Sequence, residues 1–408
     1  MKMKKIINQN KNKIILFIAF CIGSISLIFF GDKKLDNEWL NLVQNLENYN
    51  ILSSRNIDGE WIPNLLMPPL YPIFLFLIKK IFFFAENFYI NIILIIQLVL
   101  FVISSLFLKK ILNEIFNDDK ISDLGTLVFL IYPLNVYAIS QISSITLQVF
   151  FFTIFLYNFV IYYKYEKIFN LFVYAAVSGF LILLRGEFFV FFFFSLFFLF
   201  VKKKRFYIII ASILVSLIII SPYLIRNYNI FSTLALTKST GFNLLKGNNP
   251  KSKVEGIAMW TGYDVVPELE EDLKKIKPLS KYDLISDKIF LNKAFYFIKE
   301  NPLKYLILYI KKFLSFLFID MNSSYPGYYS FLNILPKILI SLTTIIAMFS
   351  FISFKINLFN YFTLLYFLHA FIFSFFFILP RYSLSVLPIQ IILSLFLYEK
   401  YLSYIKKK

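Results

Sequence analysis

The sequence of 408 residues contains a single cysteine, Cys21, and a single histidine, His369, each inside an apolar run. One cysteine excludes a disulfide within the chain and a metal site built from several thiolates. The histidine has no evident partner for serine or cysteine nucleophilic catalysis. We therefore interpret His369 as a packed or hydrogen-bonded side chain.

Apolar side chains, by contrast, are abundant: 59% of the residues are hydrophobic and 20% are aromatic, in runs that recur along nearly the whole chain. This composition is typical of a polytopic membrane protein and excludes a soluble globular one. The formal net charge is +18, and much of it lies in short turns between apolar runs. We assign this charge to membrane topology and anionic lipid headgroups, and we expect no nucleic-acid partner.

The apolar runs predict an all-α integral membrane protein with about ten transmembrane helices. The basic N-terminus, 1–13, is expected to stay in the cytoplasm ahead of a first span at 14–30, which lacks the cleavage pattern of a signal peptide. We see no internal repeat of the kind that marks inverted-repeat transporters. The other spans are expected at about 88–108, 121–140, 144–163, 168–184, 187–201, 206–224, 331–354, 357–379 and 383–402.

Two hydrophilic stretches, 31–87 and 226–302, are expected outside the cell, because basic turns hold the opposite ends of the spans in the cytoplasm. Within the first stretch, 65–84 is apolar but rich in proline, so we expect it to lie along the outer interface. The second stretch has mixed charge and too little apolar content for a large core. The basic turns contain Lys109-Lys110, Lys164 with Lys167, and Lys202-Lys203-Lys204-Arg205.

Residues 303–319 form an apolar run that includes Lys304, Lys311 and Lys312. If this run spans the membrane, the basic tail at 403–408 lies outside. If it lies in the outer interface with these lysines snorkelling, both termini are cytoplasmic, which agrees better with the charge bias. The prediction is a multi-pass protein of the inner (plasma) membrane, with a core at 14–225, an external loop at 226–302, and an interfacial helix and last spans at 303–402.

The most specific motif is the string SPYLIRNYNIFSTLALTKSTGFNLLKGNNP at 221–250. It resembles a signature of polytopic GT-C glycosyltransferases. More narrowly, it resembles the family 39-like branch that includes protein mannosyltransferases and the aminoarabinose transferase of lipid A. The matching residues are Pro222, Arg226, Asn227, Tyr228, Gly241, Asn243, Leu244, Gly247, Asn248, Asn249 and Pro250.

Other segments resemble the same family in the same order. They are Asp36 with Trp39 after the first span, Pro-Pro-Leu-Tyr-Pro at 68–72, Leu-Arg-Gly-Glu at 184–187, the helix at 294–312, and the element from Arg381-Tyr382 to Pro388. Two departures concern acidic residues: Asn37 separates Asp36 from Glu38, and 146–148 reads Thr-Leu-Gln where relatives often have Thr-Glu. A second acidic ligand for a divalent metal is therefore missing, and Asp36 is the ligand that such a metal would take.

The resemblance implies a GT-C architecture with a catalytic outer loop at 31–87. It also implies inverting transfer of a sugar from a polyprenyl-phosphate donor to a lipid, glycan or protein acceptor. In this interpretation Asp36 is the general base for the acceptor hydroxyl, and Glu38 is an auxiliary carboxylate. Positioned bases contribute about 10²–10⁴-fold to rate, so the base is expected to be essential.

Three arginines, Arg185, Arg226 and Arg381, map to the outer ends of spans, on the same side as Asp36 and against the prevailing charge bias. Because the guanidinium fork suits phosphate oxygens, we expect these arginines to bind the lipid phosphate. The further expected substrate contacts are Tyr71, Tyr382 and Asn248, with Lys311 and Lys312 as additional candidates.

Other functions stay open at this point. A flippase or transporter of lipid-linked glycans would place charges near mid-span and break helices in paired positions. A glycan polymerase or ligase would favour a large external loop rich in arginine. A catalytically inactive scaffold agrees with the missing acidic position.

Overall fold

The computed structural model describes residues 2–256, 266–318, 331–350 and 356–405. Parts of the predicted loop 226–302, run 303–319, span 331–354 and tail 403–408 lie outside these residues. The regular secondary structure of the described residues is helical except for one short hairpin, β1 (Arg55–Ile57) with β2 (Glu60–Ile62). The turn residues Asp58 and Gly59 both have positive φ, as a two-residue hairpin turn requires.

Five helices within the described residues are long and apolar enough to cross a membrane, or six if one bent pair forms a single span. The bent pair, α5 (Asp119–Ile131) and α6 (Pro133–Ser140), turns by 53°, because Pro133 cannot donate to the helix ladder. The five are the apolar part of α1 (Lys2–Phe30), η1 (Phe83–Phe88) joined to α4 (Tyr89–Phe116), α7 (Ile145–Tyr165), α10 (Phe206–Phe231) and α15 (Phe331–Ser350).

The other predicted spans are helices that fall short of this criterion, so the expected number of ten spans stays a prediction. They form α8 (Ile168–Leu184), α9 (Phe188–Lys203), α16 (Leu358–Ser374) and α17 (Leu387–Ile405). The chain is nevertheless a membrane protein, with several candidate spans and broad lipid-soluble surfaces on α1 and α10.

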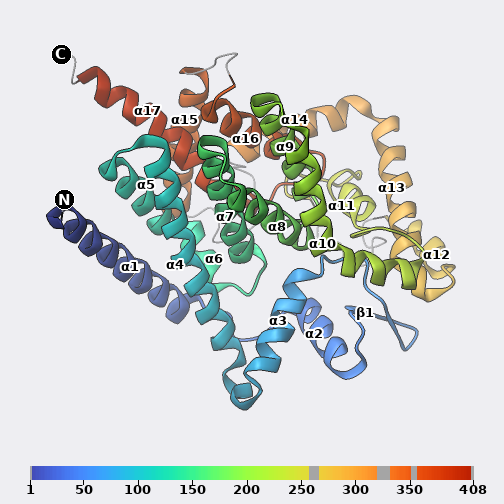
Figure 1. Ribbon diagram of the computed structural model, residues 1–408. Helices are drawn as coiled ribbons and strands as arrows, with labels where there is room; N and C mark the ends of the chain where they lie inside the picture. The colour runs from blue at the N-terminus through green and yellow to red at the C-terminus, as the bar shows by residue number, and fades with distance from the viewer. Residues whose placement is uncertain (1, 257–265, 319–330, 351–355, 406–408) are drawn as a thin grey trace.

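The helices pack around an aromatic core. α7 packs against both α4 and α8, and α8 packs against α10 (Figure 1). His369 is fully buried there: its ring stacks on Phe191 at 3.5 Å between centroids, and Nδ1 lies 2.9 Å from the Leu365 carbonyl oxygen. This is the packed histidine that the sequence predicts.

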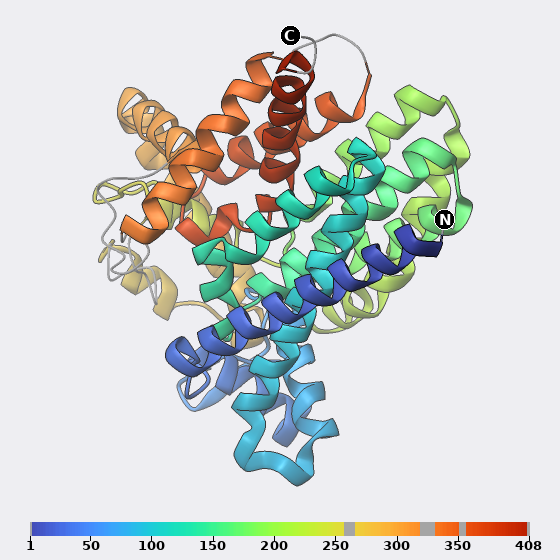
Figure 2. The same cartoon turned by 90° about the vertical axis from the view of Figure 1, so that its left-hand side faces the viewer.

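Two hydrophilic segments assemble at one end of the molecule, and we call 31–87 the first loop segment and 226–302 the second. Figures 1 and 2 both place α2 (Asn37–Tyr49) and α3 (Leu70–Ile81) at the end opposite the C-terminus. The second loop segment forms α11 (Thr240–Gly247), α12 (Leu269–Lys274), η2 (Leu279–Lys281) and α13 (Tyr282–Glu300). These helices share a small core of their own, to which Ile62 of the hairpin contributes.

The predicted interfacial helix is α14 (Pro302–Leu317), whose exposed face is apolar, with Leu303 and Leu306 among its residues. The prediction that Lys312 snorkels is wrong. Its side chain has 0% exposure and lies on the packed face of α14. The cause is a set of acceptors in α11, described below.

Candidate functional site

The two loop segments are joined at Asn64, Leu65 and Leu66. The Asp283 carboxylate of α13 accepts hydrogen bonds from the backbone N–H groups of Leu65 (2.8 Å) and Leu66 (3.0 Å), and Arg55 lies 3.4 Å from its other oxygen. Burial raises the pKa of Asp283, while Arg55 and the two N–H groups oppose this shift. A nearly buried carboxylate thus fixes the loop that continues into the cavity wall.

One turn along α13, Asp287 holds the start of α11. Its carboxylate accepts from the N–H groups of Gly241 (2.7 Å) and Phe242 (3.2 Å). A Cβ at Gly241 would lie 1.9 Å from the Asp287 carbonyl oxygen, so only glycine permits this approach of the two helices.

The end of α11 is held by Lys312. Its Nζ donates to the carbonyl oxygen of Gly247 (2.7 Å) and to Asn248 Oδ1 (3.1 Å), and burial lowers its pKa to about 7. Asn248 Nδ2 in turn donates to the carbonyl oxygens of Leu244 and Phe375. The Gly-Asn-Asn-Pro motif therefore joins α11, α14 and the segment after α16.

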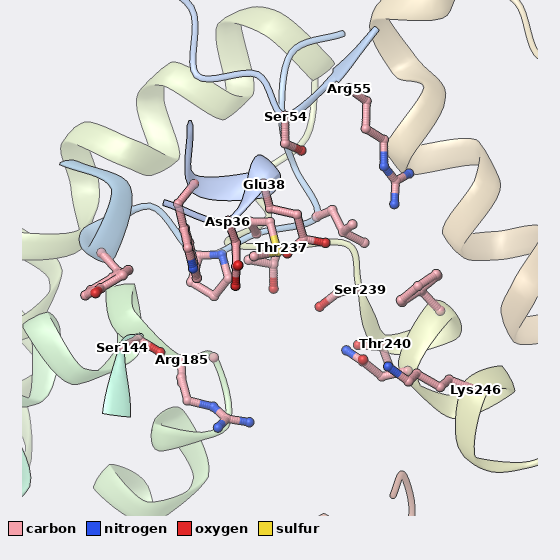
Figure 3. A pocket seen from close by; sticks show the side chains of 18 of the residues that line it. Asp36, Glu38, Ser54, Arg55, Ser144, Arg185, Thr237, Ser239, Thr240 and Lys246 are labelled. Carbon is pink, nitrogen blue, oxygen red and sulfur yellow. The ribbon is translucent and has the colours of Figure 1, made fainter. Parts of the chain in front are cut away.

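These contacts enclose a cavity of about 1560 Å³ between the loop segments and the ends of the membrane helices (Figure 3). The first loop segment contributes one wall, and α11 with the preceding residues 237–239 contributes the other. Its charged lining residues are Asp36, Glu38, Arg55, Asp58, Arg185, Glu187, Lys246, Lys274 and Arg381.

Asp36 and Glu38 project from the start of α2 into this cavity, toward the hydroxyl groups of Thr237 and Ser239 (Figure 3). Asp36 is the N-cap residue of α2, yet its side chain makes no capping bond. Within the described part of the chain, neither carboxylate forms a hydrogen bond or an ion pair. Both remain available to a ligand.

Three cations, Arg185, Lys246 and Arg381, line the same cavity as these carboxylates. Arg185, which ends α8, pairs with Glu187 and stacks over Tyr382, with its Cζ 4.8 Å from the ring centroid. Burial lowers the pKa of Lys246, and the nearby Arg381 lowers it further, whereas Glu38 raises it. Lys246 and Arg185 point into the same open space in Figure 3.

The other predicted contacts are placed differently. Tyr71 lines the cavity, but its hydroxyl donates to Gln97 (3.1 Å) and its ring meets Trp39 edge-on. Arg226 and Asn248 do not line the cavity. Arg226 donates to the carbonyl oxygen of Asn64 (2.9 Å) and to Asn227, so it supports the loop junction from α10.

A metal site made by the protein alone does not fit the described residues. Among them, no three His, Cys, Asp or Glu side chains gather in a metal-ligating group. At 146–148, where the chain has no carboxylate, the Gln148 amide donates to Ser144 on the cavity wall (2.8 Å). Asp36 and Glu38 are the carboxylates that α2 and its N-cap contribute to this cavity.

Comparison with solved structures identifies the fold. The chain is similar to the archaeal oligosaccharyltransferase AglB from Archaeoglobus fulgidus, solved in complex with an inhibitory peptide and a dolichol-phosphate, with a TM-score of 0.50 and 13% identity. The match covers 97% of this chain and 51% of that one, so the chain spans about half the length of the protein it matches. The fold is that of the GT-C transmembrane part.

A second structure of the Archaeoglobus fulgidus oligosaccharyltransferase, in complex with Zn and sulfate, matches with a TM-score of 0.47 and 13% identity, over 96% of this chain and 50% of that one. No protein-family model and no curated protein sequence matches the chain.

Within this GT-C fold, sequence reasoning missed Lys246, Asp283 and Asp287. The two aspartates could have been found, because they lie four residues apart on the apolar stripe of α13 that also carries Phe290 and Ala294. No comparable pattern in the sequence indicated Lys246. Its position in the cavity depends on how α11 packs.

Proposed function

We propose that this protein transfers a sugar from a polyprenyl-phosphate donor to an acceptor at the external face of the membrane. The observation that supports this proposal best is one cavity lined by two unpaired carboxylates, Asp36 and Glu38, and by Arg185, Lys246 and Arg381. The GT-C fold agrees with it, since the similar oligosaccharyltransferase was solved with a dolichol-phosphate.

The composition of the cavity wall supports separate binding regions for the isoprenoid chain of the donor and for the sugars. The membrane helices and the segment after α16 contribute apolar side chains, namely Leu184, Val190, Ile372, Phe373, Phe376 and Phe377. These suit the first isoprene units of the donor. The loop segments contribute polar groups that suit hydroxylated sugars, namely Asn41, Ser54, Asn56, Ser239, Thr240 and Asn243.

In the proposed reaction, Asp36 accepts the proton of the acceptor hydroxyl as its oxygen forms a bond to the anomeric carbon. The bond between that carbon and the phosphate oxygen breaks, and the polyprenyl phosphate leaves with the bonding electrons. Arg185, Lys246 and Arg381 neutralise the charge that develops on the phosphate. Attack from the side opposite the leaving group inverts the anomeric configuration.

Arg226 and Asn248 enter the proposal as positioning residues. Arg226 holds the Asn64 carbonyl, and Asn248 ties α11 to the segment after α16. A flippase is the second candidate considered from the sequence. The charged residues of the cavity come from loops and helix ends, which favours chemistry at one face over passage through the membrane.

The test follows a panel of radiolabelled polyprenyl-phosphate sugars with purified protein in lipid. Wild type is expected to consume one donor, and Asp36→Asn to lose about 10²–10⁴-fold in rate. The matched control is Asp58→Asn, which removes a carboxylate of the same cavity from the hairpin turn. Equal rates for wild type and Asp36→Asn would remove Asp36 from the chemistry, and Glu38→Gln would then be compared. A folded protein that consumes no donor would contradict the transferase proposal.

A further inference from the structure

A second cavity, of about 740 Å³, lies at the other end of α8 from the candidate site. Arg185 of the first cavity directly follows α8, and Lys167 of the second directly precedes it. The helix has 17 residues, so the two cavities are about 25 Å apart along its axis. The second cavity therefore belongs to a different depth of the membrane and is separate from the proposed reaction.

This second cavity is a groove over α7. Ile154, Tyr157 and Asn158 of α7 form its floor, Phe107 of α4 forms one wall, and the first turns of α8 form the other. The polar floor is closed by a hydrogen bond in which Asn170 Nδ2 donates to Asn158 Oδ1 (2.7 Å). Apart from Lys167 and the Tyr157 hydroxyl, the rest of the lining is apolar, which suits a hydrocarbon chain rather than a water-filled passage.

The mouth of the groove carries two lysines that have no carboxylate partner within the described residues. Lys167 lines it directly, and Lys110 Nζ lies 5.1 Å from the Phe107 ring centroid and 5.9 Å from that of Tyr157. Four other basic residues at this end have acidic partners. The pairs are Lys109 with Asp123, Lys164 with Glu114, and Lys203 and Arg205 with Glu166.

The Tyr157 hydroxyl adds a neutral polar group to this groove, and it has no hydrogen-bond partner in the described part of the chain. An apolar channel with two free ammonium groups and a free hydroxyl at its mouth matches the chemistry of an amphiphile with an anionic head. The channel lies between helices that are buried in lipid, which disfavours a nucleic acid or an acidic protein as its occupant.

We propose that this groove binds an anionic glycerophospholipid of the leaflet at the lysine-rich end. Its phosphate lies between Lys110 and Lys167, and one acyl chain follows Phe107, Ile154 and Val173. The predicted topology makes this the cytoplasmic leaflet. The bound lipid would brace α4, α7 and α8, and α8 ends at Arg185.

Native mass spectrometry of protein released from micelles with equal amounts of phosphatidylglycerol and phosphatidylcholine tests the headgroup. Wild type is expected to retain phosphatidylglycerol preferentially. Lys110→Gln/Lys167→Gln is expected to lower its affinity about 25-fold, or fivefold for each lysine, since one such charge contributes about 1 kcal/mol. The control Lys202→Gln/Lys204→Gln removes the same charge at the end of α9, outside the groove, and should retain the lipid.

Two further arms separate the sources of the signal. Val173→Trp fills the groove and should lower retention of the lipid with both lysines intact, provided that its thermal stability matches wild type. Inorganic phosphate at millimolar concentration should not displace phosphatidylglycerol. The proposal is overturned if the Lys110/Lys167 variant retains the lipid as wild type does, if both lipids are retained equally, or if inorganic phosphate competes.

Discussion

The contacts of Asp283 allow a specific prediction of how much this side chain contributes to folding stability. Its side chain has 4% exposure and accepts from the N–H groups of Leu65 and Leu66, both through the same oxygen, Oδ2. Asp283→Ala leaves two backbone donors without an acceptor, and at about 1–3 kcal/mol for each we expect a loss of about 2–6 kcal/mol. The loop from Asn64 to Met67 would then be released from α13.

Asp283→Asn separates the two roles of this carboxylate. The amide oxygen can still accept from both N–H groups, so the main loss is the charge of its pair with Arg55. The Arg55 side chain is 25% exposed, and water replaces part of that interaction. We expect a loss of about 1 kcal/mol, which is the range of a partly solvated pair.

Tryptophan fluorescence measures the unfolding of the loop segments locally. The chain has three tryptophans, and all of them lie in these segments: Trp39, Trp61 and Trp260. Guanidinium titration of detergent-solubilised protein should give a lower midpoint for Asp283→Ala than for Asp283→Asn. Asp272→Ala, an exposed carboxylate on α12, should stay within about 0.5 kcal/mol of wild type. Equal midpoints for the Ala and Asn variants would refute the view that Asp283 acts as an acceptor for the loop.

The remaining predictions concern the ends of α11. Burial lowers the pKa of Lys312 to about 7, whereas the ordinary lysine pKa is about 10.4. Between these two pH values the unfolded state therefore binds more protons than the folded state. Stability should therefore rise with pH in that window, by at most about 1.4 kcal/mol per unit, and Lys312→Met should flatten the dependence of the thermal midpoint on pH; an unchanged slope would contradict this. A Cβ at Gly247 would lie 1.8 Å from the Phe376 carbonyl oxygen, whereas at Gly186 the nearest atom would be Thr237 Oγ1 at 3.8 Å. Gly247→Ala should thus cost about 3 kcal/mol or more, measured as a fall in the thermal midpoint, while Gly186→Ala, beside the same cavity, should be neutral; equal midpoints would show that the segment after α16 moves aside freely.

Much of the fold was predictable because the length of a hydrophobic run depends only on consecutive residues of the sequence. Runs of lipid-soluble residues predict helices wherever the backbone must satisfy its own hydrogen bonds, and each expected run is helical in the described residues. The proline-rich apolar segment that the sequence predicts at the outer interface contains α3, whereas the position of Asp36 at the start of α2 was not predicted. The hairpin was missed, although Asp58-Gly59 is a recognised turn pair.

The sequence alone therefore determined that this is a helical membrane protein, and it predicted that carboxylates and arginines gather at one face. Only the tertiary structure decided which of those residues share a cavity. Arg185 and Arg381 line the same cavity as Asp36, whereas Arg226 binds the Asn64 carbonyl. Lys312 is buried rather than snorkelling because Gly247 and Asn248, more than sixty residues away, supply its acceptors. Such contacts depend on pairs of residues distant in the chain, and no local pattern of residues contains them.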